Sequence, residues 1–316
     1  NGRNFDRGPG RHCDVSLLSP YIRRRLITEA DVVKAALAEH GLQGAEKFIQ
    51  EVIWRSYFKG WLELHPKVWS DYVFGLDSDL KALSSDRTLR DKVEAAESAA
   101  TGLECFNAWT TELVETGYLH NHARMWFASI WIFTLGLPWR IGADFFFRHL
   151  LDGDPASNTC SWRWVAGLHT RGKTYQAKAS NIATFTEDRF TPRDEDLAAD
   201  LAVVALLQSQ EPEAVRDVAS LRPVSAPKSG VPTLLLLTEE DCTLEDFDIA
   251  SLDICAGVML TASHLRSSRD VSQKVIGFEA TALRDAATRA NIDAEPLRAA
   301  SPRDLVELAE GAGARQ

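Results

Sequence analysis

The feature that most constrains the fold is a change of character about two-thirds of the way along the chain. A stretch rich in Pro, Ser and Gly, Leu221–Pro232, has the composition of a linker. Before it, apolar residues recur with helical spacing in the segments 44–64, 87–100, 103–116, 119–136 and 139–151. After it come two apolar runs of strand length and two helical patterns, Thr233–Thr238, Ala256–Thr261, 280–291 and 303–312. We therefore expect a mainly α fold, all-helical at first and ending in a partial α/β domain with a parallel, Rossmann-like sheet.

The expected domains follow this change of character. They are a helical domain at 1–215, a linker at 216–232 and the partial α/β domain at 233–316. Thr28-Glu-Ala-Asp31 looks like the N-terminal cap of a helix that runs to Glu39 and stops before Gly41. The α/β part has neither a Gly-x-Gly-x-x-Gly sequence nor a Walker phosphate loop, so it does not indicate nucleotide binding. Because it stops where such a domain would enter another strand, we expect the whole protein to extend beyond this sequence.

Composition limits the classes of function. The 316 residues carry a formal net charge of -10, which argues against nucleic-acid binding through overall basicity. Any contact with DNA would then rest on a local positive cleft. Five widely spaced cysteines with no Cys-x-x-Cys pair predict a reduced, cytoplasmic protein without a metal site or iron–sulfur cluster. The apolar runs are shorter than the roughly 20 residues of a membrane span, and the sequence does not reveal the oligomeric state.

Three short segments together supply polar side chains and a pair of tryptophans, Trp162 and Trp164, a mixture that suits a planar redox cofactor better than a plain core. They are Gly117–Met125, Asp152–Asn158 and Ser161–Trp164. From about Val15 to Phe190 the chain resembles the flavin domain of the DNA photolyase/cryptochrome family. The motifs that carry the resemblance occur in the family's order: Ser16–Tyr21, Glu51–Arg55, Thr116–Asn121, Ala123–Met125, Asp152–Asp154, Asn158 and Trp162–Trp164. The resemblance implies an all-helical domain of photolyase type that binds FAD.

The resemblance also implies which residues hold the FAD. They are Ser16, Leu17, Ser19, Phe48, Arg55, Asn121, Arg124, Asp152, Asp154 and Asn158. Asn121 and Arg124 are three apart on a predicted helix and would share one face. Arg124 would pair with Asp152 near the flavin ring, and an ordinary ion pair between helices is the alternative. Asn158 would face flavin N5, and a helix cap is its alternative. Val15 and Leu17 stand where the family has Thr and Arg, so two phosphate contacts are lost.

Electron transfer in this family uses tryptophans, whose rings can be oxidised reversibly. By resemblance, Trp162 is the one nearest the flavin and Trp139 the next. The third would fall near Asp86, where no tryptophan occurs, so another Trp or a Tyr would have to take its place. The catalytic set implied by the resemblance is Glu51, Asn158, Trp162 and Trp139. Core packing is the alternative role for each tryptophan.

UV-damaged DNA is the implied partner. The residues that match the family's lesion-binding positions are Glu51, Trp54, Asn121, His122, Met125, Trp164 and Lys178. His122 stands where dimer-repairing members usually have Arg. Further phosphate contacts would come from Lys59, Arg163, Arg171, Lys173 and the run Arg23–Arg25. A solvated face is the alternative for that run.

The resemblance favours light-driven repair of cyclobutane pyrimidine dimers by electron transfer from reduced FAD, the reaction of a deoxyribodipyrimidine photo-lyase. A cryptochrome-like blue-light photosensor that binds FAD without repairing DNA is the main alternative. A helical interaction module without flavin is a third. Glu51, Trp54, Met125 and Trp164 favour repair, whereas the acidic net charge, His122 and the missing third tryptophan favour the photosensor.

Overall fold

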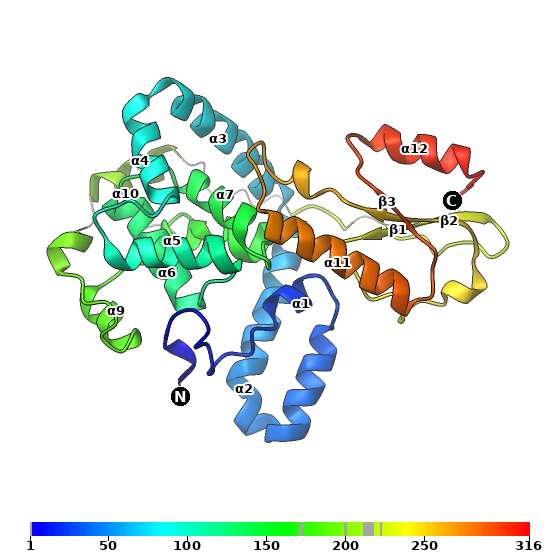
Figure 1. Ribbon diagram of the computed structural model, residues 1–316, viewed down its shortest axis with the longest axis horizontal. Helices are drawn as coiled ribbons and strands as arrows, with labels where there is room; N and C mark the ends of the chain where they lie inside the picture. The colour runs from blue at the N-terminus through cyan, green and yellow to red at the C-terminus, as the bar shows by residue number, and fades with distance from the viewer. Residues whose placement is uncertain (1, 171–172, 199–200, 211–217, 222) are drawn as a thin grey trace. The chain divides into compact units, whose positions relative to one another are not determined.

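The computed structural model describes residues 2–170, 173–198, 201–210, 218–221 and 223–316 (Figure 1). The chain forms two compact units. A helical unit consists of Asn1–Leu17 and Ser56–Ser220, and a mixed unit consists of Leu18–Arg55 and Leu221–Gln316. The mixed unit thus combines an early segment with the C-terminal part of the chain, whereas the predicted domain boundaries followed chain order. Parts of the predicted linker, residues 216, 217 and 222, lie outside the described residues.

The helical unit is built from helices of two to five turns and shorter helical segments. After the shared helix α2 (Glu29–Leu64) come α3 (Pro66–Ser85), α4 (Arg87–Glu97), α5 (Glu104–Thr116), α6 (Asn121–Ser129), η2 (Ile130–Thr134), α7 (Trp139–His149), η3 (Pro155–Cys160), α8 (Trp162–Val165), α9 (Ala179–Phe185), η4 (Asp194–Leu197) and α10 (Leu201–Gln210). The short η1 (Gly2–Asn4) precedes them. The helices predicted at 44–64, 87–100, 103–116 and 139–151 are confirmed within a few residues. Helix α3 was not predicted.

Aromatic side chains dominate the core of the helical unit. The run from Trp126 to Phe133 is buried at every position, so this stretch is surrounded on all sides. The rings of Phe106 and Phe127 stack with centroids 4.3 Å apart. The predicted helix 119–136 begins as α6 and changes at Ile130 to π-helical η2, where the Leu135 N–H bonds the Ile130 carbonyl. This packing fixes the helices that carry the pocket described below.

The mixed unit contains a three-stranded parallel sheet. Its order is β1 (Pro232–Thr238), β2 (Asp253–Leu260) and β3 (Glu295–Leu297), with Leu236 opposite Val258 and Met259 opposite Pro296. The helices of this unit are α1 (Ser19–Arg23), the first part of α2, α11 (Gln273–Arg289) and α12 (Pro302–Gly311), and two short segments are η5 (Ile249–Ser251) and η6 (Ser263–Leu265). Helix α11 covers the sheet through Leu283 and Ala286 (Figure 1). The predicted parallel α/β character is confirmed, although β3 was not predicted.

The predicted helix stop before Gly41 is confirmed. Gly41 has φ 63° inside α2, a left-handed conformation that favours glycine, and the helix kinks there. At the start of α2, the Asp31 N–H donates to the Thr28 hydroxyl oxygen at 3.2 Å, and the Asp31 carboxylate accepts from the Thr28 N–H. The cap expected from this short sequence therefore forms.

Arg23 and Arg24, two residues of the run Arg23–Arg25, lie neither on a solvated face nor where they could contact phosphates. Arg23 and Arg24 are 1% and 0% exposed. Within the mixed unit, Arg24 pairs with Glu239 and Glu279, while Arg23 bonds Glu240 with its NH1 at 2.7 Å. Both carboxylates Glu239 and Glu240 follow β1 directly, at the carboxyl end of the sheet. Burial lowers the pKa of Arg24 and raises the pKa of Glu239. For Arg23 and Arg24 both sequence expectations were therefore wrong, whereas Arg25 is partly exposed and pairs with Asp241.

Two further properties concern the described residues only. None of their helices is both long and apolar enough to cross a membrane. No three of their His, Cys, Asp or Glu side chains are grouped so that they could hold a metal ion.

The five cysteines are free, and three of them are buried. Burial raises the pKa of Cys160 to about 12 and that of Cys105 to about 11, which keeps both thiols protonated at neutral pH.

Candidate functional site

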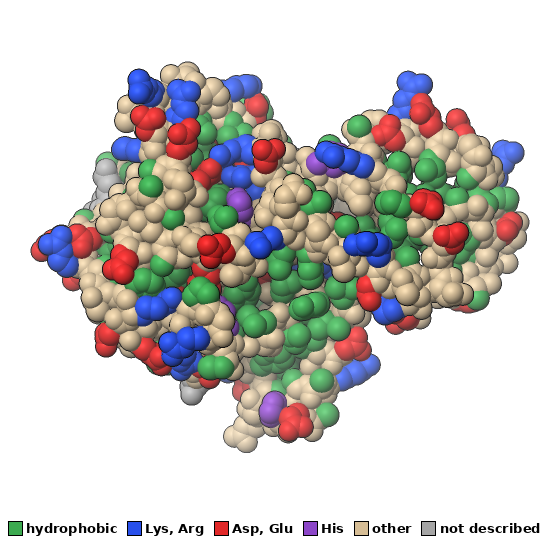
Figure 2. Space-filling model, in the orientation of Figure 1, with side chains coloured by type: hydrophobic (Ala, Val, Ile, Leu, Met, Phe, Trp, Pro, Cys, Tyr) green, Lys and Arg blue, Asp and Glu red, His purple; other side chains and the backbone are tan. Residues whose placement is uncertain are grey.

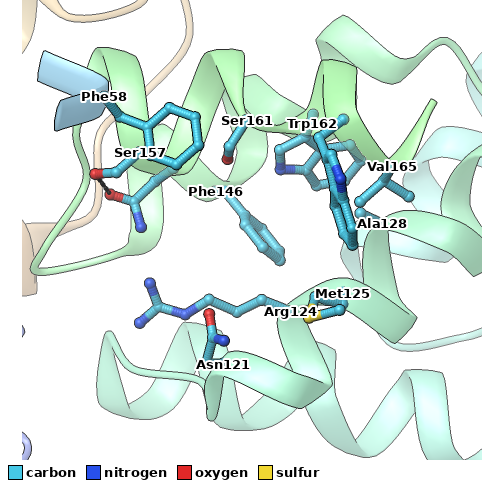
Figure 3. A pocket seen from close by; sticks show the side chains of 12 residues that line it. Phe58, Asn121, Arg124, Met125, Ala128, Phe146, Ser157, Ser161, Trp162 and Val165 are labelled. Carbon is cyan, nitrogen blue, oxygen red and sulfur yellow. Dashed lines mark hydrogen bonds between the residues drawn. The ribbon is translucent and has the colours of Figure 1, made fainter. Parts of the chain in front are cut away.

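A pocket of about 290 Å³ opens within the helical unit (Figure 3). Its walls come from α2, α6, α7, η3 and α8, and the lining residues are Phe58, Asn121, Arg124, Met125, Ala128, Phe146, Ser157, Asn158, Ser161, Trp162, Trp164 and Val165. The volume is at the lower end of the range for small-molecule pockets. A planar ring system would fit in this volume. The remainder of a dinucleotide such as FAD, the cofactor expected from sequence, would lie outside this pocket.

Helix α6 supplies one side of the pocket because of its sequence spacing. Asn121, Arg124, Met125 and Ala128 occupy positions i, i+3, i+4 and i+7, which share one helix face. In Figure 3 the first three of these side chains lie opposite Phe146. His120 is the N-cap, and its Nδ1 accepts a hydrogen bond from the His122 N–H at 3.2 Å. The helix therefore starts at Asn121, with its positive end beside the pocket.

The only charged group among the lining residues, Arg124, is held in place by three contacts. Its Nε donates to the Leu119 carbonyl at 2.7 Å, and its NH1 donates to Asp152 Oδ2 at 2.9 Å. Its guanidinium carbon lies 5.5 Å from the centre of the Tyr118 ring. The Arg124 and Asp152 side chains are 14% and 7% exposed, so this is a largely buried pair. The predicted pairing of these two residues is therefore present, although their role toward a flavin remains a prediction.

Asp154 shapes the wall that faces α6. Its Oδ1 accepts from the Ala156 and Ser157 N–H groups, both at 2.8 Å, and so it caps η3. Asp154 is 1% exposed and is not among the lining residues. The capped segment places Ser157 and Asn158 in the pocket wall, where the Ser157 hydroxyl donates to Asn158 Oδ1 at 3.4 Å. Asp154 thus stabilises the segment that forms this wall without lining the pocket itself.

Aromatic rings close the remaining side. Trp162 is 3% exposed and packs edge-on against Phe146 and Trp131, with centroids 5.0 and 6.3 Å away. Gly142 of α7 makes this packing possible, because a Cβ there would lie 2.5 Å from the Trp162 ring. Trp139 is buried 5.9 Å from Tyr72 and does not line the pocket. Only the first of the two predicted electron-transfer tryptophans therefore forms part of the wall.

The structure brings together six residues that the sequence analysis placed in the site, and it leaves others elsewhere. Asn121, Arg124, Met125, Asn158, Trp162 and Trp164 line the pocket. Ser16, Leu17 and Lys178 are exposed residues of the helical unit and do not line it. Ser19, Phe48, Glu51, Trp54 and Arg55 belong to the mixed unit. Arg171 lies outside the described residues.

His122 also lies away from the pocket lining. Its ring stacks on Trp126 with centroids 4.2 Å apart, and its Nδ1 is 3.0 Å from the Asn4 carbonyl oxygen. The sequence analysis missed Phe58, Ala128, Phe146, Ser157, Ser161 and Val165 as lining residues. The helical spacing from Asn121 would have found Ala128. Ser157 and Ser161 could have been found because they directly precede two predicted site residues, Asn158 and Trp162.

Burial lowers the pKa of His120 to about 4. Between this value and about 6.5, the unfolded chain binds a proton that the folded chain does not, so stability rises with pH across that window. We expect the free energy of unfolding to fall by up to roughly 3 kcal/mol between pH 6.5 and 4. His122 and His169, whose pKa values burial also lowers, act in the same direction.

The measurement is urea unfolding at several pH values for the wild type and for His120→Asn. Asparagine keeps a cap for the first turn of α6 but does not titrate in this range. The variant should lose less stability than the wild type on acidification. Parallel pH profiles of the two proteins would show that His120 does not carry the effect.

The pocket fits the ring end of a flavin on the chemistry of its own residues. Arg124 and the start of α6 favour negative charge, while Asn121 and Asn158 offer amide donors and acceptors. Asp152 Oδ1 is buried and has no hydrogen-bond partner among the described residues, so it remains able to accept one. Phe146 and Trp162 provide apolar walls. A planar heteroaromatic group with polar edges matches the residues that line the pocket.

Comparisons with known proteins converge on one family. Residues 48–193 match the family model described as the FAD binding domain of DNA photolyase. The deoxyribodipyrimidine photo-lyase of Streptomyces griseus is 36% identical over 157 residues, which cover 49% of this chain and 33% of that protein. The chloroplastic/mitochondrial cryptochrome DASH of Ostreococcus tauri is 35% identical over 140 residues, 44% of this chain and 24% of that protein.

A solved structure, that of a bacterial class III photolyase from Agrobacterium tumefaciens, is 29% identical, with a TM-score of 0.49. The match covers 59% of this chain and 38% of that chain. The chain thus spans about a third or less of the length of the two curated relatives above.

Proposed function

Residues 48–193 belong to the FAD-binding domain of the DNA photolyase/cryptochrome family, and from this premise we propose that the protein binds FAD and repairs cyclobutane pyrimidine dimers in DNA under light. One observation carries the proposal. Six residues from three separate segments, each expected from sequence to contact the flavin or the lesion or to transfer electrons, line a single pocket. A pocket shared in this way brings an electron donor and its acceptor together, as the reaction requires.

The residues of α6 and η3 bind and orient the flavin ring. Arg124, fixed by Asp152 and Leu119, would hold a permanent positive charge beside the flavin and would favour its reduced, anionic form. Asn158 would offer a neutral amide as a hydrogen-bonding group without adding negative charge. FAD, when bound in its reduced form, supplies the electron that splits the dimer and receives it back afterwards. Phe146 and Trp162 exclude water from the ring face.

The lesion enters beside the same residues. Trp164 lines the pocket and is 44% exposed, so it can offer an indole face to a flipped-out base. Met125 and Asn121 provide an apolar surface and an amide next to it. Flipping a damaged base costs only a few kcal/mol, which stacking on such a surface offsets.

Contact with DNA phosphates would be local. Figure 2 shows Lys and Arg side chains interspersed with Asp and Glu over the visible face, in keeping with the formal net charge of -10. Lys173 and Lys178 are exposed in the segment that follows α8.

Five free cysteines, three of them buried, support residence in the reducing cytoplasm.

A photosensor without repair activity is the second candidate, and one observation favours it. His122, one of the residues expected to contact the lesion, stacks on Trp126 with ring centroids 4.2 Å apart and is not among the described residues that line the pocket. The described lining therefore holds only part of the expected lesion-binding set. A photosensor would need only the flavin-binding part.

Dimer reversal separates the two candidates. Photoreduced protein is mixed with an oligonucleotide that carries one cyclobutane thymine dimer, exposed to blue light, and compared with a dark sample. Light-dependent recovery of intact thymines is expected. Trp164→Ala should lower that recovery, whereas Phe74→Ala, which removes an aromatic ring that is 77% exposed outside the pocket, should not. A yellow, reducible protein that restores no thymine would establish the photosensor instead.

A further inference from the structure

Trp164 is one half of an aromatic stack. Its ring and that of Tyr175 have centroids 5.4 Å apart and planes inclined by 27°. Trp164 lines the pocket, whereas Tyr175 is half-buried and does not. An offset stack of this kind contributes beyond the burial of its area. Tyr175 therefore restricts the Trp164 ring without lining the pocket itself.

The segment that carries Tyr175 is anchored at several points. The Tyr175 N–H donates to the Val165 carbonyl at 3.0 Å, which ties the segment to the end of α8. Two residues later, the Ala177 N–H donates to the hydroxyl of Ser129, itself 2% exposed, at 2.8 Å. Burial raises the pKa of Tyr175. The phenol therefore stays protonated at neutral pH, and its ring is fixed to the core.

We propose that Tyr175 is a positioning residue, which holds the indole of Trp164 so that its open face receives an unstacked pyrimidine base. The proposal rests on the function proposed above and extends it to a residue with no role in the pocket lining. Trp164 belongs to the four-residue helix α8 and is 44% exposed, so part of its indole remains open to a base while Tyr175 stacks on it. A ring already held in its binding orientation loses less rotamer freedom when a base stacks on it.

The chemistry of the same segment suits a nucleotide. Lys173 and Lys178 flank Tyr175 along the chain, and both are exposed. An aromatic stack bordered by lysines is the arrangement with which proteins hold unpaired bases while neutralising the phosphates between them. The segment 173–178 thus provides a ring support and two cations within six residues.

The test is a double-mutant cycle in binding. Fluorescence anisotropy in the dark gives the Kd for a labelled oligonucleotide with one cyclobutane thymine dimer, with the undamaged oligonucleotide as reference. Tyr175→Leu should raise the Kd for the damaged oligonucleotide about 3- to 10-fold, whereas Tyr175→Phe, which keeps the ring, should stay within about 2-fold. Trp164→Ala should raise it about 5- to 150-fold. In the Trp164→Ala protein, Tyr175→Leu should add no further loss.

Each other outcome overturns a stated part of the proposal. If Trp164→Ala weakens binding and Tyr175→Leu does not, Tyr175 has no positioning role and the lesion pocket stands. If Tyr175→Leu weakens binding equally with and without Trp164, it acts through general loss of structure. If neither change affects binding, the lesion pocket itself fails and the role of Tyr175 with it. Thermal unfolding of each variant, measured alongside, identifies a protein that has lost its fold.

Discussion

Arg124→Ala is expected to release the flavin and to destabilise the helical unit by about 3 kcal/mol. The change leaves the Asp152 carboxylate, 7% exposed, without the guanidinium that lies 2.9 Å from it. Breaking a buried pair costs more than the pair contributes, because the remaining charge stays desolvated. The midpoint of thermal unfolding should fall by about 6–12 °C, and purified protein should lose the absorbance of bound flavin.

Two variants serve as controls for this result. Lys67→Ala removes one partner of an exposed pair, Lys67–Asp71, and should change stability by less than about 1 kcal/mol. The double variant Arg124→Ala/Asp152→Asn also removes the unpaired carboxylate charge of residue 152. It should therefore regain much of the lost stability but should still bind no flavin. If Arg124→Ala behaves like Lys67→Ala in both stability and flavin content, the Arg124–Asp152 pair is not the anchor of the site.

Gly142→Ala is expected to disturb the tryptophan wall and to destabilise the helical unit by about 1–3 kcal/mol. The added Cβ would lie 2.5 Å from the Trp162 ring and 2.8 Å from Trp131 Nε1, so both rigid, buried indoles would have to move. The unfolding midpoint should fall by about 2–12 °C. Because Trp162 lines the pocket, flavin affinity should fall as well, and fluorescence titration with FAD measures that loss.

Gly60→Ala is the matched control, because Gly60 also lies in a helix and a Cβ there meets no atom within 4 Å. It should leave flavin affinity unchanged and should increase stability by up to about 1 kcal/mol. Equal effects of the two alanines would mean that the clash at Gly142 is relieved without moving Trp162.

The sequence predicted the pocket best where a local rule operates. Asn121, Arg124 and Met125 meet because three- and four-residue spacing puts side chains on one helix face. The pairing of Arg124 with Asp152 was expected only from the resemblance to a family, since 28 residues separate the two and no local rule joins them. Trp139 was expected beside Trp162 on the same ground, and its place outside the pocket lining depends on packing that the sequence does not show.

Elements stabilised by distant contacts were harder to predict. Helix α3 includes Gly75 and several Ser and Asp residues of low helix propensity, and tertiary packing overrides that preference. Arg140 crosses α3 where Gly75 leaves room for it. Strand β3 has three residues, one of them Pro296, so it lacks the apolar run of a typical strand. The partners of Arg23 and Arg24 follow more than 200 residues later, beyond any local pattern.

The ion pairs of Arg23 and Arg24 have a consequence for the way the protein can be divided. A fragment cut at the Pro-rich segment would retain the carboxylates of Glu239 and Glu279 and their partner Arg266, but it would lose Arg24, which pairs with both of them, and Arg23, which pairs with Glu240. Such a fragment would carry more negative than positive charge in this cluster at the end of its sheet and would be a poor candidate for separate expression. The segments Leu18–Arg55 and Leu221–Gln316 therefore fold together as one unit. Truncated forms of this protein that are made to study its function should keep both segments on the same polypeptide.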